Sequence, residues 1–328
     1  MKPVTWGVLS AARHFSYRIR PALKGSATTE LAAIASRTLE KAERAAREMS
    51  IPKAYGSYEE LLADPRIEAV YIPLPNHLHA EWVKKAADAG KHILCEKPFG
   101  TNAEETRESI AHARARGVLV MEAFMYRFHP QWRRVRELVA IGEIGAVRAV
   151  HTVYSYLNTD PANIRNILAA GGGAIPDIGC YAVSAARFIL GREPSRAISL
   201  VARDPVFKTD ILSSAILDFG DARALFTVAT QARPAQSVEV LGTGGAIRIP
   251  LPFNAWPDGP QEVTVTTGLG ARTVRFPVVD QYAVMFDEMS RAIREGGPVP
   301  TDPRDAVENM KALDALFRSE RSGAWEKV

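Results

Sequence analysis

The sequence predicts an α/β protein: a doubly wound parallel sheet, followed by an α+β domain with a large open sheet that is mixed and mostly antiparallel. Two observations lead to this prediction. Strand and helix patterns alternate up to residue 124, which is typical of a parallel sheet with helices on both faces. Beyond that point several strand-like segments follow one another with short turns, which is typical of antiparallel pairing. We therefore place a domain boundary between 1–124 and 125–328.

The first part of the chain opens with a βαβ pattern. Apolar runs at 4–9 and 30–35 predict two buried strands with a helix-compatible segment between them. Helices and strands then alternate along the chain, at 39–49, 69–73, 78–89, 92–96, 103–116 and 118–124.

In the second part, strands and helices no longer alternate regularly. It opens with a helix at 130–141 and a long strand near 146–157, and it is rich in helix up to residue 190. Further strands are predicted near 196–203, 211–219, 222–230, 236–241, 246–249 and 262–276. Two helices, near 281–295 and 303–320, close the chain.

The composition indicates an ordinary globular protein. Hydrophobic residues make up 47% of the chain and charged residues 24%. The net charge of +4 is scattered, and the arginines at 133, 134 and 136 alternate with apolar residues as on an exposed helix face, so we expect no nucleic-acid partner. The chain enters a strand directly after Pro3 and no apolar stretch is long enough for a membrane span. We therefore expect a cytoplasmic protein without a membrane partner.

The loop after the first strand is a weak candidate for phosphate binding. In an open parallel sheet a dinucleotide's pyrophosphate binds at the first strand-to-helix turn. That turn contains Ser10, Ala11, Ala12 and Arg13, where a G-x-G-x-x-G motif would supply glycines. The small residues still permit close approach of the backbone, and Ser10 can donate to a phosphate. A plain strand-to-helix turn is an equally good interpretation of this loop alone.

The end of the second strand favours NADP over NAD. An Asp or Glu at this place would bind the 2′-hydroxyl of NAD, but the chain has Ser36 and Arg37. The guanidinium of Arg37 matches a 2′-phosphate, and Ser36 is a short hydrogen-bonding partner. The alternative is that Arg37 begins a solvated helix face.

Further candidates follow the next two strands at the same predicted edge. They are Leu74, Pro75, Asn76, His79, Glu96 and Lys97. Asn76 can cap the following helix or reach a ribose hydroxyl. An ammonium is costly to bury, so a polar crevice beside the cofactor explains Lys97 at a strand end better than a core position does. His77, His79 and Cys95 lack the spacing of a zinc site, and we expect no metal.

These stretches resemble the Gfo/Idh/MocA oxidoreductases. The resemblance rests on residues 7–12 (GVLSAA), 75–79 (PNHLH) and 96–98 (EKP), in this order and spacing. Residues 171–181 (GGGAIPDIGCY) look like the family's G-G-G-x-x-x-D-x-G-x-[HY] segment, and 280–282 (DQY) look like a late helix opening in many members. The resemblance covers nearly the whole chain.

The resemblance implies a Rossmann domain at 1–124, and at 125–328 a substrate-binding domain whose open sheet commonly forms the subunit interface. We therefore expect a homodimer or homotetramer through that sheet. It also implies hydride transfer between a nicotinamide and a carbon of a small sugar or polyol. We favour an aldose 1-dehydrogenase acting on D-xylose or a similar sugar. The alternatives are a keto-sugar or trans-dihydrodiol oxidoreductase and, in another class, an NADP(H)-binding sensor without turnover.

Carried over residue by residue, the resemblance makes Lys97 the catalytic lysine and Asp177 and Tyr181 its partners across the cleft. Two departures are visible: the glycine fingerprint is reduced to Ser10 and Ala12, and position 181 is Tyr where some members have His. Four residues apart, Asp177 and Tyr181 would share a helix face. Without the family, a helix cap and a core aromatic would be the simpler interpretation of the two.

The chemistry of these residue types fits the implied reaction. Oxidation of an alcohol needs a base for the hydroxyl proton. A free phenol, with a pKa of about 10, is too weakly acidic for this, but a nearby ammonium lowers the pKa. We therefore predict Tyr181 as the acid/base and Lys97 as its electrostatic partner, with the reverse assignment open because coupled groups share their titration. Asp177 would orient one of them or bind a sugar hydroxyl.

Three further residues are candidates for ligand contact. Asn163 and Arg165 precede the glycines and offer donors and acceptors to a polyol. An exposed helix surface explains them nearly as well. Arg127, just after the strand that ends at Phe124, is a candidate for holding cofactor or substrate.

Overall fold

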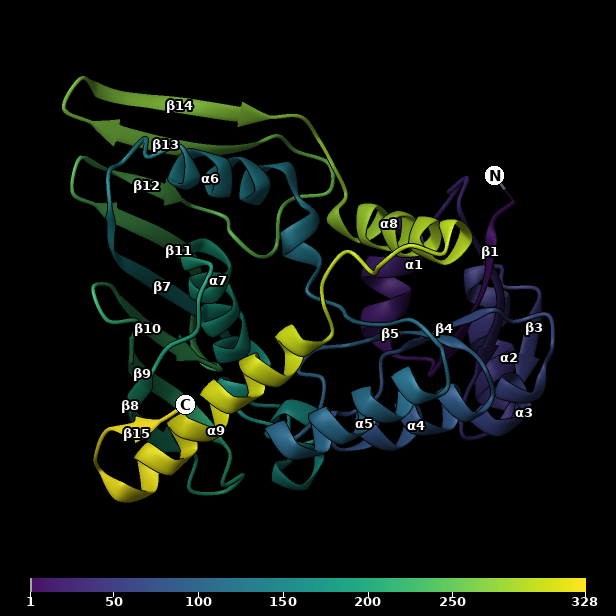
Figure 1. Cartoon of the computed structure of the whole chain (residues 1–328). Coiled ribbons are helices and arrows are strands. Elements are labelled where there is room, and N and C mark those ends of the chain that lie inside the picture. The colour runs from purple at the N-terminus through teal and green to yellow at the C-terminus, as the bar shows by residue number, and fades with distance from the viewer. Residues whose placement is uncertain (1) are drawn as a thin grey trace. The chain divides into compact units, whose positions relative to one another are not determined.

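The computed structural model describes residues 2–328 and divides into two compact units, whose elements are labelled in Figure 1. The first unit comprises the chain up to Phe124 together with Tyr282–Val307, and the second comprises Met125–Gln281 and Glu308–Val328. The sequence analysis assigned 282–307 to the second domain, whereas its contacts group it with the first. Among residues 2–328, no helix is both long enough and apolar enough to cross a bilayer.

A six-stranded parallel sheet forms the centre of the first unit. Its strands are β1 (Val4–Leu9), β2 (Thr29–Ala35), β3 (Lys53–Tyr55), β4 (Ala69–Ile72), β5 (His92–Cys95) and β6 (Val120–Glu122). They lie in the order β3-β2-β1-β4-β5-β6, and every neighbouring pair is parallel. The predicted doubly wound sheet is therefore confirmed, and β3 is a strand that the sequence analysis missed.

Helices cover this sheet. They are α1 (Arg20–Ala22), α2 (Leu39–Met49), α3 (Tyr58–Ala63), α4 (His79–Asp88), α5 (Ala103–Ala115) and α8 (Gln281–Glu295). Of these, α2, α3 and α5 begin at side-chain caps. The side chains of Thr38, Ser57 and Asn102 accept hydrogen bonds from the backbone N–H three residues on, which satisfies a helix donor that has no partner inside the helix.

Helix α8 belongs to the core of the first unit although it lies far along the chain. The indole Nε1 of fully buried Trp6 donates to Ser290 Oγ at 3.0 Å, and the Trp6 ring lies 5.0 Å from the ring of Phe286. Arg294 donates from Nη1 and Nη2 to the two carboxylate oxygens of Glu68, each at 2.6 Å. These contacts join α8 to β1 and to the start of β4.

The second unit is built on a nine-stranded sheet. Its strands are β7 (Val147–Leu157), β8 (Arg196–Arg203), β9 (Asp210–Asp218), β10 (Arg223–Ala229), β11 (Gln231–Gly242), β12 (Gly245–Ile249), β13 (Gln261–Thr267), β14 (Gly270–Phe276) and β15 (Glu326–Lys327). Their order is β14-β13-β12-β11-β7-β10-β9-β8-β15. The pair β7/β10 is parallel and the other neighbours are antiparallel, so the predicted mixed, mostly antiparallel sheet is confirmed.

The predicted single strand at 262–276 is a hairpin. The turn between β13 and β14 is Gly268 and Leu269, and Gly270, which begins β14, has a φ of 117°, a conformation that residues with a Cβ rarely adopt. The sequence analysis missed this turn, although Gly268 and Gly270 flank Leu269 there.

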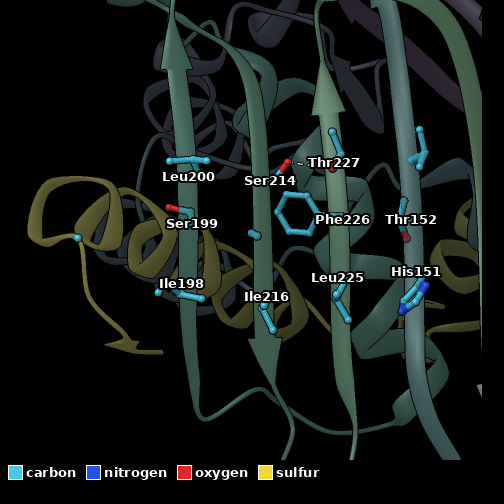
Figure 2. Close-up of a pocket in the computed structure, with 13 residues that line it drawn as sticks. His151, Thr152, Ile198, Ser199, Leu200, Ser214, Ile216, Leu225, Phe226 and Thr227 are labelled. Carbon is cyan, nitrogen blue, oxygen red and sulfur yellow. Dashed lines mark hydrogen bonds between the residues drawn. The ribbon is translucent and has the colours of Figure 1, made fainter.

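Helices α6 (Pro130–Ala140), α7 (Cys180–Leu190) and α9 (Arg304–Ser322) complete the second unit. Ser199 Oγ on β8 donates to the carbonyl of Leu316 on α9 at 2.7 Å, and Arg203 pairs with Glu320 through two hydrogen bonds of 2.6 and 2.7 Å. The opposite face of β7 to β10 has no such cover within the unit. It presents Leu200, which is 79% exposed, among the apolar side chains drawn in Figure 2.

The pair formed by Glu68 and Arg294 predicts a pH-dependent contribution to stability. Arg294 and the N–H of Thr5, which donates at 2.9 Å, lower the pKa of Glu68 from 4.5 to about 2. A carboxylate with a lowered pKa stabilises the folded state above its unfolded pKa, and this stabilisation is lost as the pH falls through the folded pKa. After a discount for solvent screening, Glu68→Gln should lower the free energy of unfolding at pH 7 by about 2 kcal/mol.

Urea unfolding of wild type and Glu68→Gln between pH 7 and pH 3 measures this difference. It should narrow as the pH falls below 4.5, because Glu68 then gains a proton in the unfolded chain while it stays ionised in the folded wild type. The matched control is Glu30→Gln, an exposed carboxylate on β2, which should change little at any pH. Equal stability of Glu68→Gln and wild type at pH 7 would contradict the prediction.

Candidate active site

The segment after β5 carries Lys97 between neighbours that are held in place. Glu96 accepts a hydrogen bond from the Tyr71 hydroxyl at 2.5 Å and another from the N–H of Lys97 at 3.3 Å. The N–H of Phe99 donates to Glu122 Oε1 at 2.8 Å. Burial, and then the charge of Glu96, raise the pKa of Tyr71 well above 10, so this phenol remains a donor. Lys97 itself is half-buried at the carboxyl edge of the sheet, as predicted from its place after a strand.

His79 is fully buried and its ring faces the backbone of two strand ends. Nδ1 lies 2.8 Å from the carbonyl oxygen of Pro98, and Nε2 lies 2.8 Å from that of Leu74. The sequence analysis assigned His79 and Leu74 to cofactor binding. In the structure both ring nitrogens of His79 are occupied by these two carbonyls.

The other predicted residues after β4 differ in how exposed they are to a ligand. Leu74 is buried, Pro75 and Asn76 are half-buried, and Asn76 begins a single 3-10 turn, Asn76–Leu78. The N-cap of α4 is Leu78, so Asn76 is not the cap of that helix.

The first loop adopts a glycine-like conformation without a glycine. Ser10 has a φ of 143°, in the region that L-residues rarely occupy, at the place where the dinucleotide motif has its first glycine. The Ser10 side chain lies near the Tyr58 hydroxyl and lowers its pKa. Ala11 and Ala12 are half-buried and Arg13 is exposed, so this loop presents small side chains and backbone to a ligand.

The end of β2 lies beside the same tyrosine. Burial raises the pKa of Tyr58, whereas the Ser10 hydroxyl and the charge of Arg37 lower it, which places all three residues close together. Ser36 is buried and its N–H donates to the carbonyl of Tyr55 at 3.2 Å, whereas Arg37 is exposed. An exposed guanidinium without a neighbouring acid in 35–38 is a donor set that fits a phosphate-bearing ribose.

In the second unit Asp177 is the centre of a polar cluster. It lies on a π-helical turn, Ile175–Gly179, and its Oδ2 accepts from the Tyr156 hydroxyl at 2.6 Å and from Arg165 Nε at 2.9 Å. Asn163 Oδ1 accepts from the N–H of Arg165 at 3.1 Å. The charge of Asp177 raises the pKa of Arg165, and burial together with that charge raises the pKa of Tyr156. The cluster is therefore a carboxylate held by a cation and a neutral phenol.

A second carboxylate positions the turn that bears Asp177. Asp210 Oδ2 accepts from the N–H of Ile175 at 2.6 Å and from Ser213 Oγ at 3.4 Å. A Cβ on Gly173, whose φ is 135°, would lie 1.9 Å from Asp210 Oδ1. The glycine segment is therefore needed for close approach as well as for its conformation. Burial raises the pKa of Asp210 from 3.8 to about 6.

Tyr181 follows one turn later, in the first turn of α7. Its side chain is buried, and its hydroxyl lies 3.3 Å from Met125 Sδ. Its ring packs near those of Tyr154 and Phe253, with centroids 5.8 and 5.1 Å away. The sequence analysis expected a helix beginning at Asp177, but the regular α-helix begins at Cys180.

Arg127 is buried in the second unit. Its guanidinium donates from Nη2 to Ser184 Oγ at 2.7 Å and from Nε to the Tyr126 hydroxyl at 3.3 Å. These contacts join it to α7. Its predicted role toward a ligand stays a prediction.

The structure thus gathers two groups of predicted residues. Ser10 and Arg37 lie together in the first unit, and Asn163, Arg165 and Asp177 lie together in the second. Lys97 belongs to the first unit and Tyr181 to the second, so their meeting remains a prediction. Three participants escaped the sequence analysis: Tyr58, Tyr156 and Asp210. Among the described residues, no group of three or more His, Cys, Asp or Glu side chains could hold a metal.

The doubly wound parallel sheet of the first unit is the architecture of many nucleotide-binding α/β proteins. A family model described as an oxidoreductase family with an NAD-binding Rossmann fold matches residues 4–124, and a GFO/IDH/MocA C-terminal domain model matches 132–248. The chain belongs to the Gfo/Idh/MocA oxidoreductases. This confirms the predicted family and the prediction of a nicotinamide-dependent oxidoreductase.

Two relatives illustrate the family's range. A D-xylose 1-dehydrogenase (NADP(+)) of Haloferax volcanii is 40% identical, over 97% of this chain and 98% of the relative. A trans-1,2-dihydrobenzene-1,2-diol dehydrogenase of Mus musculus is 36% identical, over 74% of each chain.

A solved structure is similar across both units. The 3-ketoreductase KijD10 of Actinomadura kijaniata, in complex with NADP and TDP-benzene, has a TM-score of 0.91 and 29% identity, over 97% of this chain and 98% of that one. Variants of that enzyme with a tyrosine replaced by Phe, or a lysine replaced by Ala or Glu, have also been solved.

The strained conformation of Ser10 leads to a prediction on stability. Ser10→Gly removes the cost of a positive φ, and Ser10→Ala keeps that cost; both variants lose the hydroxyl. Strain of this kind costs of order 1–3 kcal/mol, and the greater freedom of unfolded glycine offsets part of it. Ser10→Gly should therefore exceed Ser10→Ala in free energy of unfolding by about 1 kcal/mol. Urea unfolding of both variants measures this, and a more stable Ser10→Ala would refute it.

Proposed function

We propose that this oxidoreductase transfers hydride between NADP and a sugar carbon, acting as an aldose 1-dehydrogenase on D-xylose or a similar pentose. The observation that carries the proposal is the likeness to the Haloferax volcanii D-xylose 1-dehydrogenase, at 40% identity over 97% of the chain. The bound cofactor supplies the carbon that accepts or returns the hydride. The chain's own residues bind and orient the sugar and move the hydroxyl proton.

The end of β2 supports NADP as the cofactor. Exposed Arg37 offers a planar pair of donors for a 2′-phosphate, and an acid that would select the 2′-hydroxyl of NAD is missing from 35–38. Tyr58, beside Arg37 and Ser10, can cover the adenosine end of the site. The structural neighbour KijD10 was crystallised with NADP.

Lys97 and Tyr181 are the proposed pair for proton transfer. The ammonium of Lys97 favours the phenolate of Tyr181, so that the phenol can take the hydroxyl proton of the sugar and return it in the reverse direction. The variants of KijD10 support this assignment: the substituted tyrosine follows the substituted lysine by the same number of residues that separates Lys97 from Tyr181.

Asp177 is proposed to hold a sugar hydroxyl rather than to act as the base. Its Oδ2 already accepts from Tyr156 and Arg165, and these bonds favour the ionised, hydrogen-bond-accepting form. Arg165 and Asn163 add donors and an acceptor around the same carboxylate. A polyol presents several hydroxyls at fixed spacing, which this cluster can recognise together.

A keto-sugar reduction is the second candidate. The observation that favours it is the TM-score of 0.91 with a 3-ketoreductase. A ketoreductase transfers hydride from the nicotinamide to a ketone, which is the reverse of alcohol oxidation. A reductase would work on a ketone that is already formed, and the same pair would then donate the proton.

The open face of the second sheet supports self-association. Leu200 is 79% and Val153 43% exposed on one face of the sheet, and both line a hollow of about 630 Å³. Figure 2 shows Ile198, Leu200, Ile216 and Leu225 side by side on this face. A contiguous apolar surface of this kind favours a second copy of the chain as its cover.

A panel of aldoses and keto-sugars, each with NADP(H) and NAD(H), tests the function through the absorbance of the reduced nicotinamide. We expect D-xylose to be oxidised with NADP at a higher kcat/KM than with NAD. Tyr181→Phe should lower kcat by about 10²- to 10⁴-fold with little change in the Kd for NADPH, since it removes a proton donor and acceptor. Tyr17→Phe, at a tyrosine that is 76% exposed, is the control. Full activity of Tyr181→Phe would refute the assignment, and reduction of keto-sugars alone would favour the second candidate.

If the chain self-associates through this open face, a charged side chain introduced there should lower the mass of the assembly in solution. Wild type should elute as a dimer or larger in size-exclusion chromatography with light scattering. Leu200→Glu should shift it toward the monomer, because a buried unpaired carboxylate is costly. Leu269→Glu places the same charge at the fully exposed β13–β14 turn and should leave the mass unchanged. A monomeric wild type would exclude this interface.

A further inference from the structure

The His79 ring contacts the backbone of the turns that follow two neighbouring strands. Its two ring nitrogens each lie 2.8 Å from a backbone carbonyl oxygen, Pro98 on one side and Leu74 on the other. The side chain is fully buried at the start of α4, between the turns that follow β4 and β5. It therefore connects the two turns that the sequence analysis associated with the cofactor.

Carbonyl oxygens only accept hydrogen bonds, so each contact needs a proton on the facing nitrogen. A neutral imidazole has one N–H and a protonated ring has two. Burial lowers the pKa of His79, whereas the two carbonyls and Glu96 raise it and Lys97 lowers it. In either protonation state, a proton on Nδ1 keeps the bond to Pro98.

The Pro98 carbonyl is a backbone point one residue after Lys97 that contacts a side chain from another element. On one side of Lys97, Glu96 N–H donates to the carbonyl of Ile72 at 3.1 Å, which continues the strand ladder. On the other side, Pro98 has no N–H and its carbonyl is held by His79. Removing this bond leaves the Pro98–Phe99 peptide unit, one residue beyond Lys97, held by the bond from Phe99 N–H to Glu122 Oε1 at 2.8 Å, while the strand on the other side stays fixed.

We propose that His79 is a positioning residue, whose Nδ1–H bond to the Pro98 carbonyl fixes the direction of the Lys97 side chain. This inference rests on the proposed role of Lys97 in hydride transfer. It replaces the predicted role of His79 as a cofactor ligand, since the ring nitrogens are occupied by the two carbonyls.

Two isosteric substitutions separate the two contacts of the ring. In His79→Asn the amide nitrogen reaches the position of Nδ1, which retains the Pro98 bond and loses the Leu74 bond. In His79→Gln the amide nitrogen reaches the position of Nε2, with the opposite result. A merely structural histidine would make both variants unstable without distinguishing their turnover.

The expected result is a split in kcat between the variants. His79→Asn should keep kcat within about threefold of wild type, and His79→Gln should lose about tenfold or more, because misplacement of a catalytic group by a fraction of an ångström is costly. The Kd for NADPH should change less than about threefold in both variants, since no cofactor contact is removed. Equal kcat values for the two variants, or a loss confined to the Kd for NADPH, would overturn the proposal.

A second measurement does not depend on turnover. Lysine labelled with ¹³C at Cε reports the environment of Lys97 by NMR, with Lys97→Arg used to assign its signal. The pH titration of that signal should match wild type in His79→Asn and differ in His79→Gln. If wild type oxidises no sugar but this pattern holds, the proposed function fails and the positioning role stands. If both variants titrate like wild type, the positioning role fails whatever the substrate.

Discussion

The parallel arrangement of β2, β1, β4 and β5 is the constraint on which the first unit depends. Neighbouring parallel strands end at the same edge, so four turns must share that edge. Each turn leaves backbone groups that the ladder cannot satisfy, and side chains from adjacent turns satisfy them. The Tyr71 hydroxyl donates to Glu96, and the two ring nitrogens of His79 each lie 2.8 Å from a carbonyl oxygen, those of Pro98 and Leu74. The groups that face a ligand are therefore set by bonds between turns rather than within them.

The fold could be predicted to a large extent because its signals are local. Alternating strand and helix patterns predict the parallel sheet, and the change of rhythm near residue 125 marks the start of the second unit. The assignment of 282–307 to the first unit could not be predicted in this way. It depends on partners more than two hundred residues away, such as Trp6 for Ser290 and Glu68 for Arg294. Local periodicity carries no information on such pairs.

The candidate site was predictable where topology alone brings residues together. The proximity of Ser10 and Arg37 was predictable because both follow adjacent strands. Tyr156 and Asp210 were not found, because their roles depend on which face of a strand they occupy. In β7 the residues at 150, 152 and 154 are buried, and Tyr156 continues that face at a point where the pairing with β11 shifts register. A sequence pattern does not reveal such a shift.

The two carboxylates beside the glycine segment differ in what surrounds them, and this difference separates their roles. Asp210 is buried and accepts hydrogen bonds from a backbone N–H and a hydroxyl. Burial raises its pKa to about 6. Ionisation of this carboxyl is therefore unfavourable and does not stabilise the folded state as the pH rises. Asp177 accepts from a guanidinium and a phenol instead. Because the charge of Asp177 is already compensated by these two donors, its carboxylate can accept a further hydrogen bond from a ligand hydroxyl without the cost of desolvating an unpaired charge. Asp210 is therefore suited to hold the turn, and Asp177 to meet a polyhydroxylated ligand.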